Sequence, residues 1–212
     1  MKILVTGATG QVGEALLSSM APLGKVEAAC RSGVRPDGTA AHALDLADLH
    51  GLVALLDQVM PDVVVNAAAY TAVDKAEQEE SVATAINGIA PGVLARWCAA
   101  HGALLVHYST DYVFPGNATQ PYREGDPTGP VGAYGRSKLA GEQAVLASGC
   151  QAIVLRTAWV YGPRGGNFLL KMLRLGEARD QLAVVSDQRG APTTARLIAN
   201  ATAGAVAKWV GF

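Results

Sequence analysis

The stretch Val5-Thr6-Gly7-Ala8-Thr9-Gly10-Gln11-Val12-Gly13 decides the fold of this chain. It joins an apolar run at residues 2–6, which predicts a strand, to a segment at residues 11–20 whose pattern predicts a helix. The GxxGxxG spacing allows a tight turn, because glycine takes positive φ and lets the backbone approach another group closely. The start of the helix offers free N–H groups and the positive end of its dipole. The stretch therefore predicts a loop that binds a dinucleotide pyrophosphate, and an ordinary glycine-rich turn is the weaker alternative.

Apolar runs and helix-like segments alternate along the rest of the chain, a pattern typical of βαβ units and a parallel sheet. The predicted strands cover residues 2–6, 25–29, 41–44, 62–66, 103–108 and 152–156. The predicted helices cover residues 11–20, 49–60, about 81–100 with Pro91 inside, 134–147, 167–176 and 194–210. The predicted fold class is α/β, a Rossmann-type doubly wound parallel sheet with helices on both faces. We expect a dinucleotide-binding domain at residues 1–165 and an incomplete, small substrate-binding region at 166–212.

Composition excludes several classes of protein. The chain has 212 residues, half of them apolar, and a formal net charge of -1. This suits one buried core and gives no electrostatic attraction to nucleic acid or to an acidic membrane. The first apolar run is too short for a signal peptide or a membrane span, so we expect a cytoplasmic protein. The four histidines and three cysteines show no metal-ligand spacing, so no metal is expected.

The choice of cofactor depends on the residues that follow the second strand. An acidic residue is expected there for a ribose 2′-hydroxyl, but the sequence has Arg31 and no carboxylate before Asp37. Because a guanidinium can pair with a 2′-phosphate, we expect NADPH, with NADH as the alternative. Asp45 and Leu46 follow the third strand, where we expect the adenine. The fourth strand ends in three small residues that let the backbone lie against the cofactor, Ala67, Ala68 and Ala69.

Tyr134 and Lys138 form the predicted catalytic pair. They are four residues apart on a predicted helix and therefore share one face. A lysine cation close to a tyrosine lowers the pKa of the phenol and makes it a usable acid or base. A hydroxyl at the end of the fifth strand could polarise a substrate carbonyl, for which Thr110 is the first candidate and Ser109 the second. Residues 115–132 hold four prolines and four glycines and predict a surface loop over this site.

Six runs of residues together resemble the dTDP-4-dehydrorhamnose reductases, a family of extended short-chain dehydrogenases/reductases. They are VTGATGQVG at 5–13, NAAAYTAVDKAE at 66–77, STDYVF at 109–114, YGRSKLAGE at 134–142, RTAWVY at 156–161 and DQRGAPT at 187–193. The resemblance covers nearly the whole chain. It implies reduction of the 4-keto group of dTDP-4-dehydro-L-rhamnose to dTDP-L-rhamnose by NAD(P)H.

The resemblance also implies roles for single residues. Thr110 would polarise the ketone, Tyr134 would donate the proton, and Lys138 would tune Tyr134 and bind the ribose. The implied cofactor-binding residues are Gly7, Thr9, Gly10, Gln11, Val12, Gly13, Arg31, Asp45, Leu46, Ala67, Ala68, Ala69, Tyr134 and Lys138. The implied substrate-binding residues are Thr71, Val73, Thr110, Tyr112, Tyr134, Trp159 and Asn167.

Two departures from the family pattern bear on this prediction. Intact members continue past residue 212 with the part that completes the small domain and its hold on the nucleotide. Some members form dimers through magnesium, held in part by an acidic residue just after the glycine loop, where this chain has Ala15 after Glu14. We therefore expect no metal, while a homodimer stays compatible with the resemblance.

Two other functions compete with the reductase. The first is another extended short-chain enzyme, such as a sugar-nucleotide epimerase or dehydratase that retains NAD, and Arg31 argues mildly against it. The second is a non-catalytic NADP-binding regulatory subunit. The presence of Thr110, Tyr134 and Lys138 argues against the second, whereas the shortened length argues for it.

Overall fold

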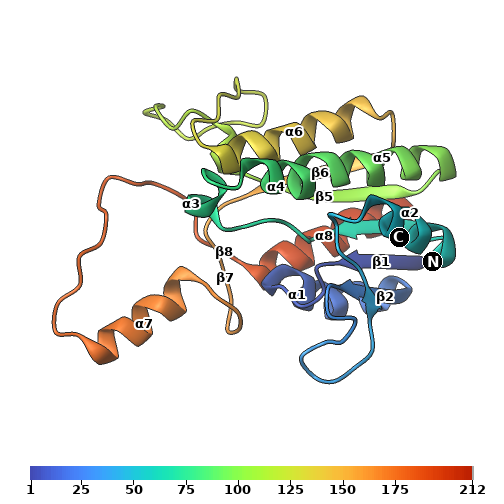
Figure 1. Ribbon diagram of the computed structural model, residues 1–212, viewed down its shortest axis with the longest axis horizontal. Coiled ribbons are helices and arrows are strands. Elements are labelled where there is room, and N and C mark those ends of the chain that lie inside the picture. The colour runs from blue at the N-terminus through green and yellow to red at the C-terminus, as the bar shows by residue number, and fades with distance from the viewer. Residues whose placement is uncertain (212) are drawn as a thin grey trace.

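A six-stranded parallel sheet forms the centre of the computed structural model, which describes residues 1–211 (Figure 1). Its strands are β1 (Lys2–Thr6), β2 (Lys25–Cys30), β3 (His42–Ala43), β4 (Val63–Asn66), β5 (Leu104–Thr110) and β6 (Ala152–Thr157). They lie in the order β3-β2-β1-β4-β5-β6, and every neighbouring pair is parallel. From β1 the chain adds strands outward to β3, then crosses back and adds β4 to β6 on the other side of β1. A Rossmann fold binds its ligand at this crossover point, between β1 and β4. The predicted fold class is confirmed.

Helices cover both faces of the sheet. Helices α2 (Leu49–Val59), α5 (Ala90–His101) and α6 (Ala133–Ala147) lie on one face, and α1 (Gln11–Met20) and α8 (Ala195–Val210) lie on the other (Figure 1). Alternate strand residues face opposite layers, as the two-residue period of a strand requires. Leu4 packs with the first layer, whereas Ile3 and Val5 pack with the second. All four residues of β4 and all seven of β5 are buried, so the apolar runs of the sequence are central strands.

The helix predicted at about residues 81–100 is divided into three pieces. They are α4 (Glu80–Thr84), a π-helical turn (Ala85–Ile89) and α5, and the short helix α3 (Val73–Ala76) precedes them. Pro91 lies in the first turn of α5, directly after the π-helical turn. The wide π turn joins α4 to α5, and such turns are frequent at functional sites.

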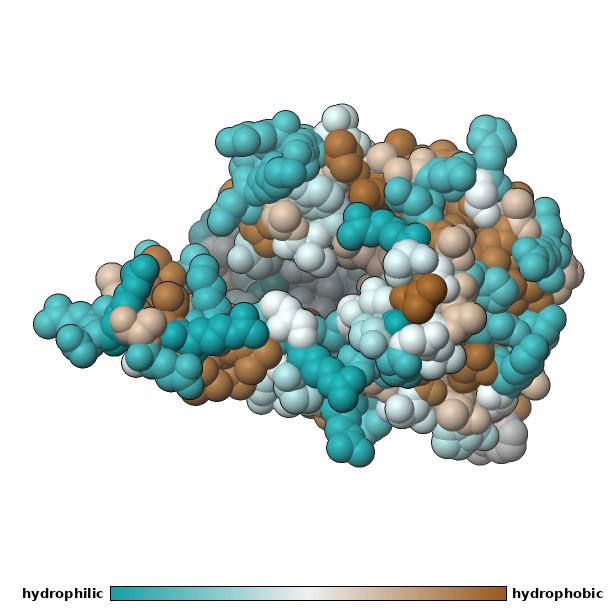
Figure 2. All heavy atoms as spheres, turned by 60° about the horizontal axis from the view of Figure 1, so that its bottom comes forward, coloured by the Kyte–Doolittle hydropathy of each residue, from teal (hydrophilic) through white to brown (hydrophobic). Residues whose placement is uncertain are grey.

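One segment stands away from the rest of the molecule. It comprises residues 162–192 and contains α7 (Phe168–Ala178), which has no buried residue. Two short strands close its base, where β7 (Val160–Tyr161) pairs in parallel with β8 (Thr193–Thr194). We call residues 162–192 the projecting segment. Figure 1 shows α7 beside the body, and Figure 2 shows the molecular surface hollowed between the two.

The end of the chain returns to the body. Three residues of α8, Ile198, Ala199 and Val206, pack with α1 in the core on one face of the sheet. The division of the chain at residue 165 stays a prediction, and the packing assigns α8 to the same core as the sheet. Within residues 1–211, no helix combines the length and the apolar character that crossing a bilayer requires.

Candidate active site

The glycine loop forms a cradle at the carboxyl end of β1. Gly7 has φ 67°, and a Cβ atom there would lie 2.6 Å from the backbone N of Ala68. A Cβ atom at Gly13 would collide with the carbonyl oxygen of Gly7, so both positions require glycine. Gly10 is the N-cap of α1 and has no side chain to bind the first N–H groups of the helix. The cradle and its free N–H groups fit the pyrophosphate of a dinucleotide.

The other residues predicted to bind the cofactor lie near the same sheet edge. Arg31 directly follows β2 and is exposed to solvent. Asp45 follows β3 and is exposed, and its Oδ1 accepts a hydrogen bond of 2.9 Å from the N–H of Ala47. Leu46 is only 5% exposed and packs in the core, so its side chain serves the core. Ala67, Ala68 and Ala69 directly follow β4, next to the glycine loop.

Thr110 is the last residue of β5 and lies at the centre of the predicted catalytic group. Its Oγ1 donates to Asp111 Oδ1 at 3.1 Å and accepts from the N–H of Tyr112 at 3.2 Å. The rings of Tyr112 and Tyr134 meet edge to face, with 5.6 Å between their centroids. Burial raises the pKa of Tyr134 to about 12, and hydrogen bonding with Thr110 opposes that rise. The predicted pair of hydroxyls, Thr110 and Tyr134, is therefore brought together.

Lys138 lies one turn further along α6 and is 3% exposed. Its Nζ donates a hydrogen bond of 2.6 Å to the carbonyl oxygen of Tyr108. Burial lowers the pKa of Lys138 to about 8, and the charge of Glu142 acts in the opposite direction. An ammonium group has three N–H donors, so two stay available for a ligand after the bond to Tyr108.

The relation between Lys138 and Tyr134 differs from the sequence-based expectation. Lys138 was expected to lower the pKa of Tyr134, but burial dominates and the nearby Asp111 and Tyr112 raise that pKa further. The ammonium of Lys138 is turned toward the carbonyl oxygen of Tyr108. As a result, Tyr134 keeps its proton at neutral pH, which suits a proton donor.

Several residues around the catalytic group were not singled out from the sequence. Asp111 accepts a hydrogen bond from the Thr110 hydroxyl, and burial raises the pKa of the Asp111 carboxyl. Asn87, in the π-helical turn, donates to the hydroxyl of Ser137 at 3.0 Å, and Ser137 donates to the carbonyl oxygen of Tyr134 at 2.8 Å. The STDYVF and YGRSKLAGE runs contain Asp111 and Ser137, whereas Asn87 belonged to no predicted motif.

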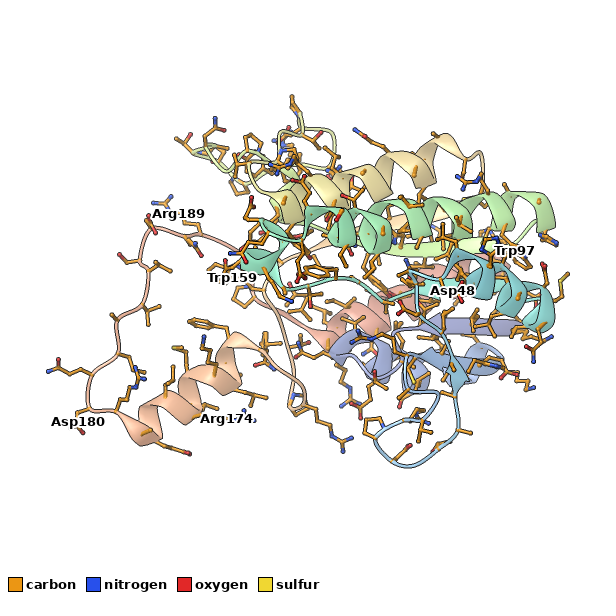
Figure 3. All side chains as sticks on the ribbon, viewed as in Figure 1. Asp48, Trp97, Trp159, Arg174, Asp180 and Arg189 are labelled. Atoms are coloured by element: carbon orange, nitrogen blue, oxygen red, sulfur yellow. The ribbon has the colours of Figure 1, made fainter. Side chains whose placement is uncertain are left out.

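The residues predicted to bind substrate come from separate parts of the chain. Thr71 and Val73 lie before and at the start of α3, and Val73 is half-buried. Trp159 is 44% exposed, has φ 46°, and its ring lies against Gly190. Positive φ is rare for a bulky residue and marks backbone strain. Figure 3 places Trp159 at the base of the projecting segment, with Arg174 and Asp180 further out on it.

Asn167 connects the projecting segment to the glycine loop. Its side chain caps α7 by accepting from the N–H of Leu170, and its Nδ2 donates to Gln11 Oε1 at 2.8 Å. A predicted substrate residue and a predicted cofactor residue are therefore in direct contact. Glu14, one turn into α1, pairs with Arg164 at the same junction. In the described part of the chain, no group of three or more His, Cys, Asp or Glu residues is arranged to hold a metal ion.

Comparison with known proteins identifies the family. The family model described as the RmlD substrate binding domain matches residues 1–211. A dTDP-4-dehydrorhamnose reductase from Burkholderia thailandensis is 51% identical over 207 residues, which are 98% of this chain and 66% of that protein. The enzyme of the same name from Escherichia coli K12 is 44% identical over 97% of this chain and 67% of its own length. The chain thus spans about two thirds of the length of these curated relatives.

Solved structures agree with the sequence relatives. A dTDP-4-dehydrorhamnose reductase from Clostridium acetobutylicum superimposes with a TM-score of 0.89 at 38% identity, covering 98% of this chain and 71% of that chain. The Bacillus anthracis enzyme, solved in complex with NADP, gives a TM-score of 0.85 at 33% identity, covering 96% and 70%. This chain belongs to the dTDP-4-dehydrorhamnose reductase family.

Proposed function

We propose that this chain reduces the 4-keto group of dTDP-4-dehydro-L-rhamnose to give dTDP-L-rhamnose, with NADPH as the reductant. One observation carries the proposal: Thr110, Tyr134 and Lys138 gather at the carboxyl end of β5, beside a glycine loop that fits a pyrophosphate. Membership of a family named for this activity supports the choice of reaction.

The side chains divide the chemistry among them. The nicotinamide supplies the hydride when it is bound. Tyr134 keeps its proton at neutral pH and donates it to the developing alkoxide at O4 of the sugar. Thr110 orients the carbonyl oxygen once its hydroxyl turns from Asp111 toward the substrate. Lys138 holds the nicotinamide ribose with the two N–H groups that the Tyr108 carbonyl leaves available.

NADPH is the proposed cofactor, and NADH is a poorer alternative. Arg31 is exposed directly after β2, where a ribose 2′-phosphate would lie. The Bacillus anthracis relative was solved with NADP. The pyrophosphate is assigned to Gly7, Thr9, Gly10, Gln11, Val12 and Gly13, and the adenosine to Arg31, Asp45 and Leu46, the last through its backbone.

The sugar is proposed to lie between the catalytic group and the projecting segment. Thr71, Val73, Tyr112, Trp159 and Asn167 are assigned to this side, and the hollow between the body and α7 gives it room (Figure 2). An apolar wall with a few polar groups suits a deoxysugar. We also propose a cytoplasmic location, since free cysteines such as Cys98 suit a reducing compartment, and a homodimer is compatible with the family resemblance.

The test is consumption of NADPH by the purified chain in the presence of dTDP-4-dehydro-L-rhamnose, followed by absorbance, with NADH run in parallel. Steady turnover, with kcat/KM for NADPH at least about tenfold above that for NADH, supports both parts of the proposal. An epimerase would consume no NADPH in net terms. A regulatory subunit would bind NADPH without turnover, and either result would contradict the proposal.

A further inference from the structure

A partly buried ion pair lies one helical turn beyond the proposed catalytic lysine. Glu142 is on α6, and its side chain is 3% exposed. The guanidinium of Arg156, on β6, binds both carboxylate oxygens, with Nε 2.9 Å from Oε1 and Nη2 2.7 Å from Oε2. This two-point arrangement is the strongest that a carboxylate and an arginine can form. The pair therefore fixes the direction in which the Glu142 carboxylate points.

Arg156 also holds the loop between β5 and α6. Its Nη1 donates to the carbonyl oxygen of Glu124 at 3.0 Å, and its guanidinium lies 4.9 Å from the centre of the Phe114 ring. Phe114 stacks in turn on Tyr122, with 4.3 Å between ring centroids. The loop begins just after Thr110–Val113 and ends at Gly132, the N-cap of α6. One guanidinium thus joins β6, α6 and the loop.

Glu142 lies four residues after Lys138, so the two side chains share one face of α6. A buried carboxylate and a buried ammonium one turn apart attract each other strongly, because little water separates them. Even so, Lys138 bonds to the carbonyl oxygen of Tyr108, and both oxygens of Glu142 bond to Arg156. Arg156 thereby competes with Lys138 for the carboxylate.

We propose that Glu142 and Arg156 are positioning residues that act as a unit on Lys138. Glu142 stabilises the charged ammonium in its buried site, and Arg156 prevents the carboxylate from drawing that ammonium away from the cofactor. The inference deepens the proposed function, on which it rests for the role of Lys138 in cofactor binding. No atom of the pair needs to touch the cofactor or the sugar.

The surroundings of Lys138 make this effect measurable. The titratable groups near Lys138 are Tyr134 and Glu142 on α6 and His107 on β5. Burial lowers the pKa of His107 far below its ordinary value, so His107 stays neutral at physiological pH. Tyr134 also stays neutral, since its pKa is raised to about 12. Glu142 and, behind it, Arg156 are the charges left to act on Lys138 from α6 and β6.

The experiment measures the pKa of Lys138 directly. The chain has six lysines, so ¹³C-labelled lysine gives few NMR signals, and Lys138→Met assigns the one of interest. A pH titration requires no cofactor and no sugar, so its result does not depend on the proposed reaction. Glu142→Gln should lower the pKa of Lys138 below its starting value of about 8, because an anion is lost. Arg156→Gln should raise it, because the carboxylate is released toward the ammonium.

The double variant Glu142→Gln/Arg156→Gln separates this effect from general damage to the fold. It removes the carboxylate through which Arg156 acts, so the pKa of Lys138 should lie near that of Glu142→Gln and should not rise as it does in Arg156→Gln. If Arg156→Gln does not fold, Arg156→Lys replaces it; this variant keeps the cation and should leave the pKa of Lys138 near that of wild type. Glu142→Gln then still tests whether loss of the carboxylate lowers the pKa of Lys138. Shifts in the same direction for the two single variants, or no shift in either, would overturn the inference.

A second readout is the affinity for NADPH, measured by fluorescence titration at neutral pH. Arg156→Gln should weaken binding about tenfold, as expected for one displaced charged hydrogen bond, and the double variant should bind better than Arg156→Gln. The matched control is Arg136→Gln, which removes another two-point pair of the same helix, with Glu80 at 2.8 and 2.9 Å on the exposed side. It should change neither the pKa of Lys138 nor the affinity. A double variant as weak as Arg156→Gln would reduce the pair to a structural role.

Discussion

The body of the molecule and the projecting segment, which we propose as the two sides of the site, are held in different ways. In the body, Thr110 is 5% exposed and Lys138 is 3% exposed, and each is held by hydrogen bonds to neighbouring elements. In the projecting segment, α7 has no buried residue, although Phe168 and Leu173 are large and apolar. The proposed catalytic side is therefore organised by the core, whereas the proposed substrate side is held by a few contacts at its base.

This difference separates stability from substrate affinity. A change in the body should affect folding or the chemical step, because the side chains there are packed on several elements. A change in the projecting segment should affect how the sugar nucleotide binds and leave the core intact. The following variants test this separation, from the largest expected effect to the smallest.

Tyr134→Phe removes one hydroxyl from the body side and should give the largest loss. We expect kcat to fall by about 10²–10⁴-fold, the usual contribution of a positioned proton donor. The affinity for NADPH should stay within about twofold of wild type, because the backbone of the glycine loop is unchanged. Steady-state kinetics and fluorescence titration measure the two quantities. A loss of less than tenfold would remove Tyr134 from the proton-transfer step.

The same truncation in the two regions compares their packing directly. Leu105 on β5 is fully buried, and Leu105→Ala should lower the free energy of unfolding by about 2–5 kcal/mol. Leu173 on α7 is 57% exposed, and Leu173→Ala should change the free energy of unfolding by less than about 0.5 kcal/mol. Urea unfolding followed by circular dichroism measures both. Similar costs at the two sites would show that α7 is packed as firmly as the sheet.

Lys138→Met should separate activity from stability within the body. Turnover should fall, though by less than in Tyr134→Phe. The free energy of unfolding at pH 7 should rise by roughly 1–2 kcal/mol, because removing a buried charge outweighs the loss of its hydrogen bond. The folded-state pKa of Lys138, about 8, lies below the ordinary 10.5. In that interval the unfolded wild-type chain binds more protons than the folded one, so wild type gains stability on the variant as pH rises from about 8. If the difference in the free energy of unfolding between Lys138→Met and wild type does not shrink as pH rises, the lowered pKa of Lys138 is contradicted.

Asn167→Ala should have only a small effect, and it should act on the proposed substrate side. It removes the N-cap of α7 and the hydrogen bonds to Gln11 and Gly162. Loss of a cap costs about 1 kcal/mol, and we expect a rise of about fivefold in KM for the sugar nucleotide with little change in kcat. Ser148→Ala, remote on the far end of α6, serves as the control. An equal loss in kcat would place Asn167 in the catalytic group instead.

The sequence predicted the body well because its signals are local. Residues 2–6 and 11–20 were predicted with the bounds that β1 and α1 have, since the apolar period and the glycines mark both ends. The other five strands were also found, although β5 continues two residues further, to Thr110, than the apolar run indicates. The division of the helix predicted at 81–100 was only partly foreseen, because Pro91 marks the start of α5 but nothing local marks a π turn.

Contacts between distant residues could not be predicted. The pairing of β7 with β8 joins residues more than thirty positions apart, and each strand has two residues, too few to show a period. The contact of Gln11 with Asn167 and the pairing of Glu142 with Arg156 depend on how separate elements pack. The raised pKa of Tyr134 depends on burial, which the spacing of Tyr134 and Lys138 cannot report. The residues proposed for the site could thus be named from the sequence, but their electrostatics required the fold.

The central claim is tested most directly by following the transferred hydrogen. The purified chain is incubated with NADPH deuterated at C4 of the nicotinamide and with dTDP-4-dehydro-L-rhamnose, and the sugar product is examined by NMR. The account predicts dTDP-L-rhamnose with deuterium at C4, formed by wild type and abolished in Tyr134→Phe. Bound NADPH without labelled product would contradict the claim that this chain carries a working reductase site.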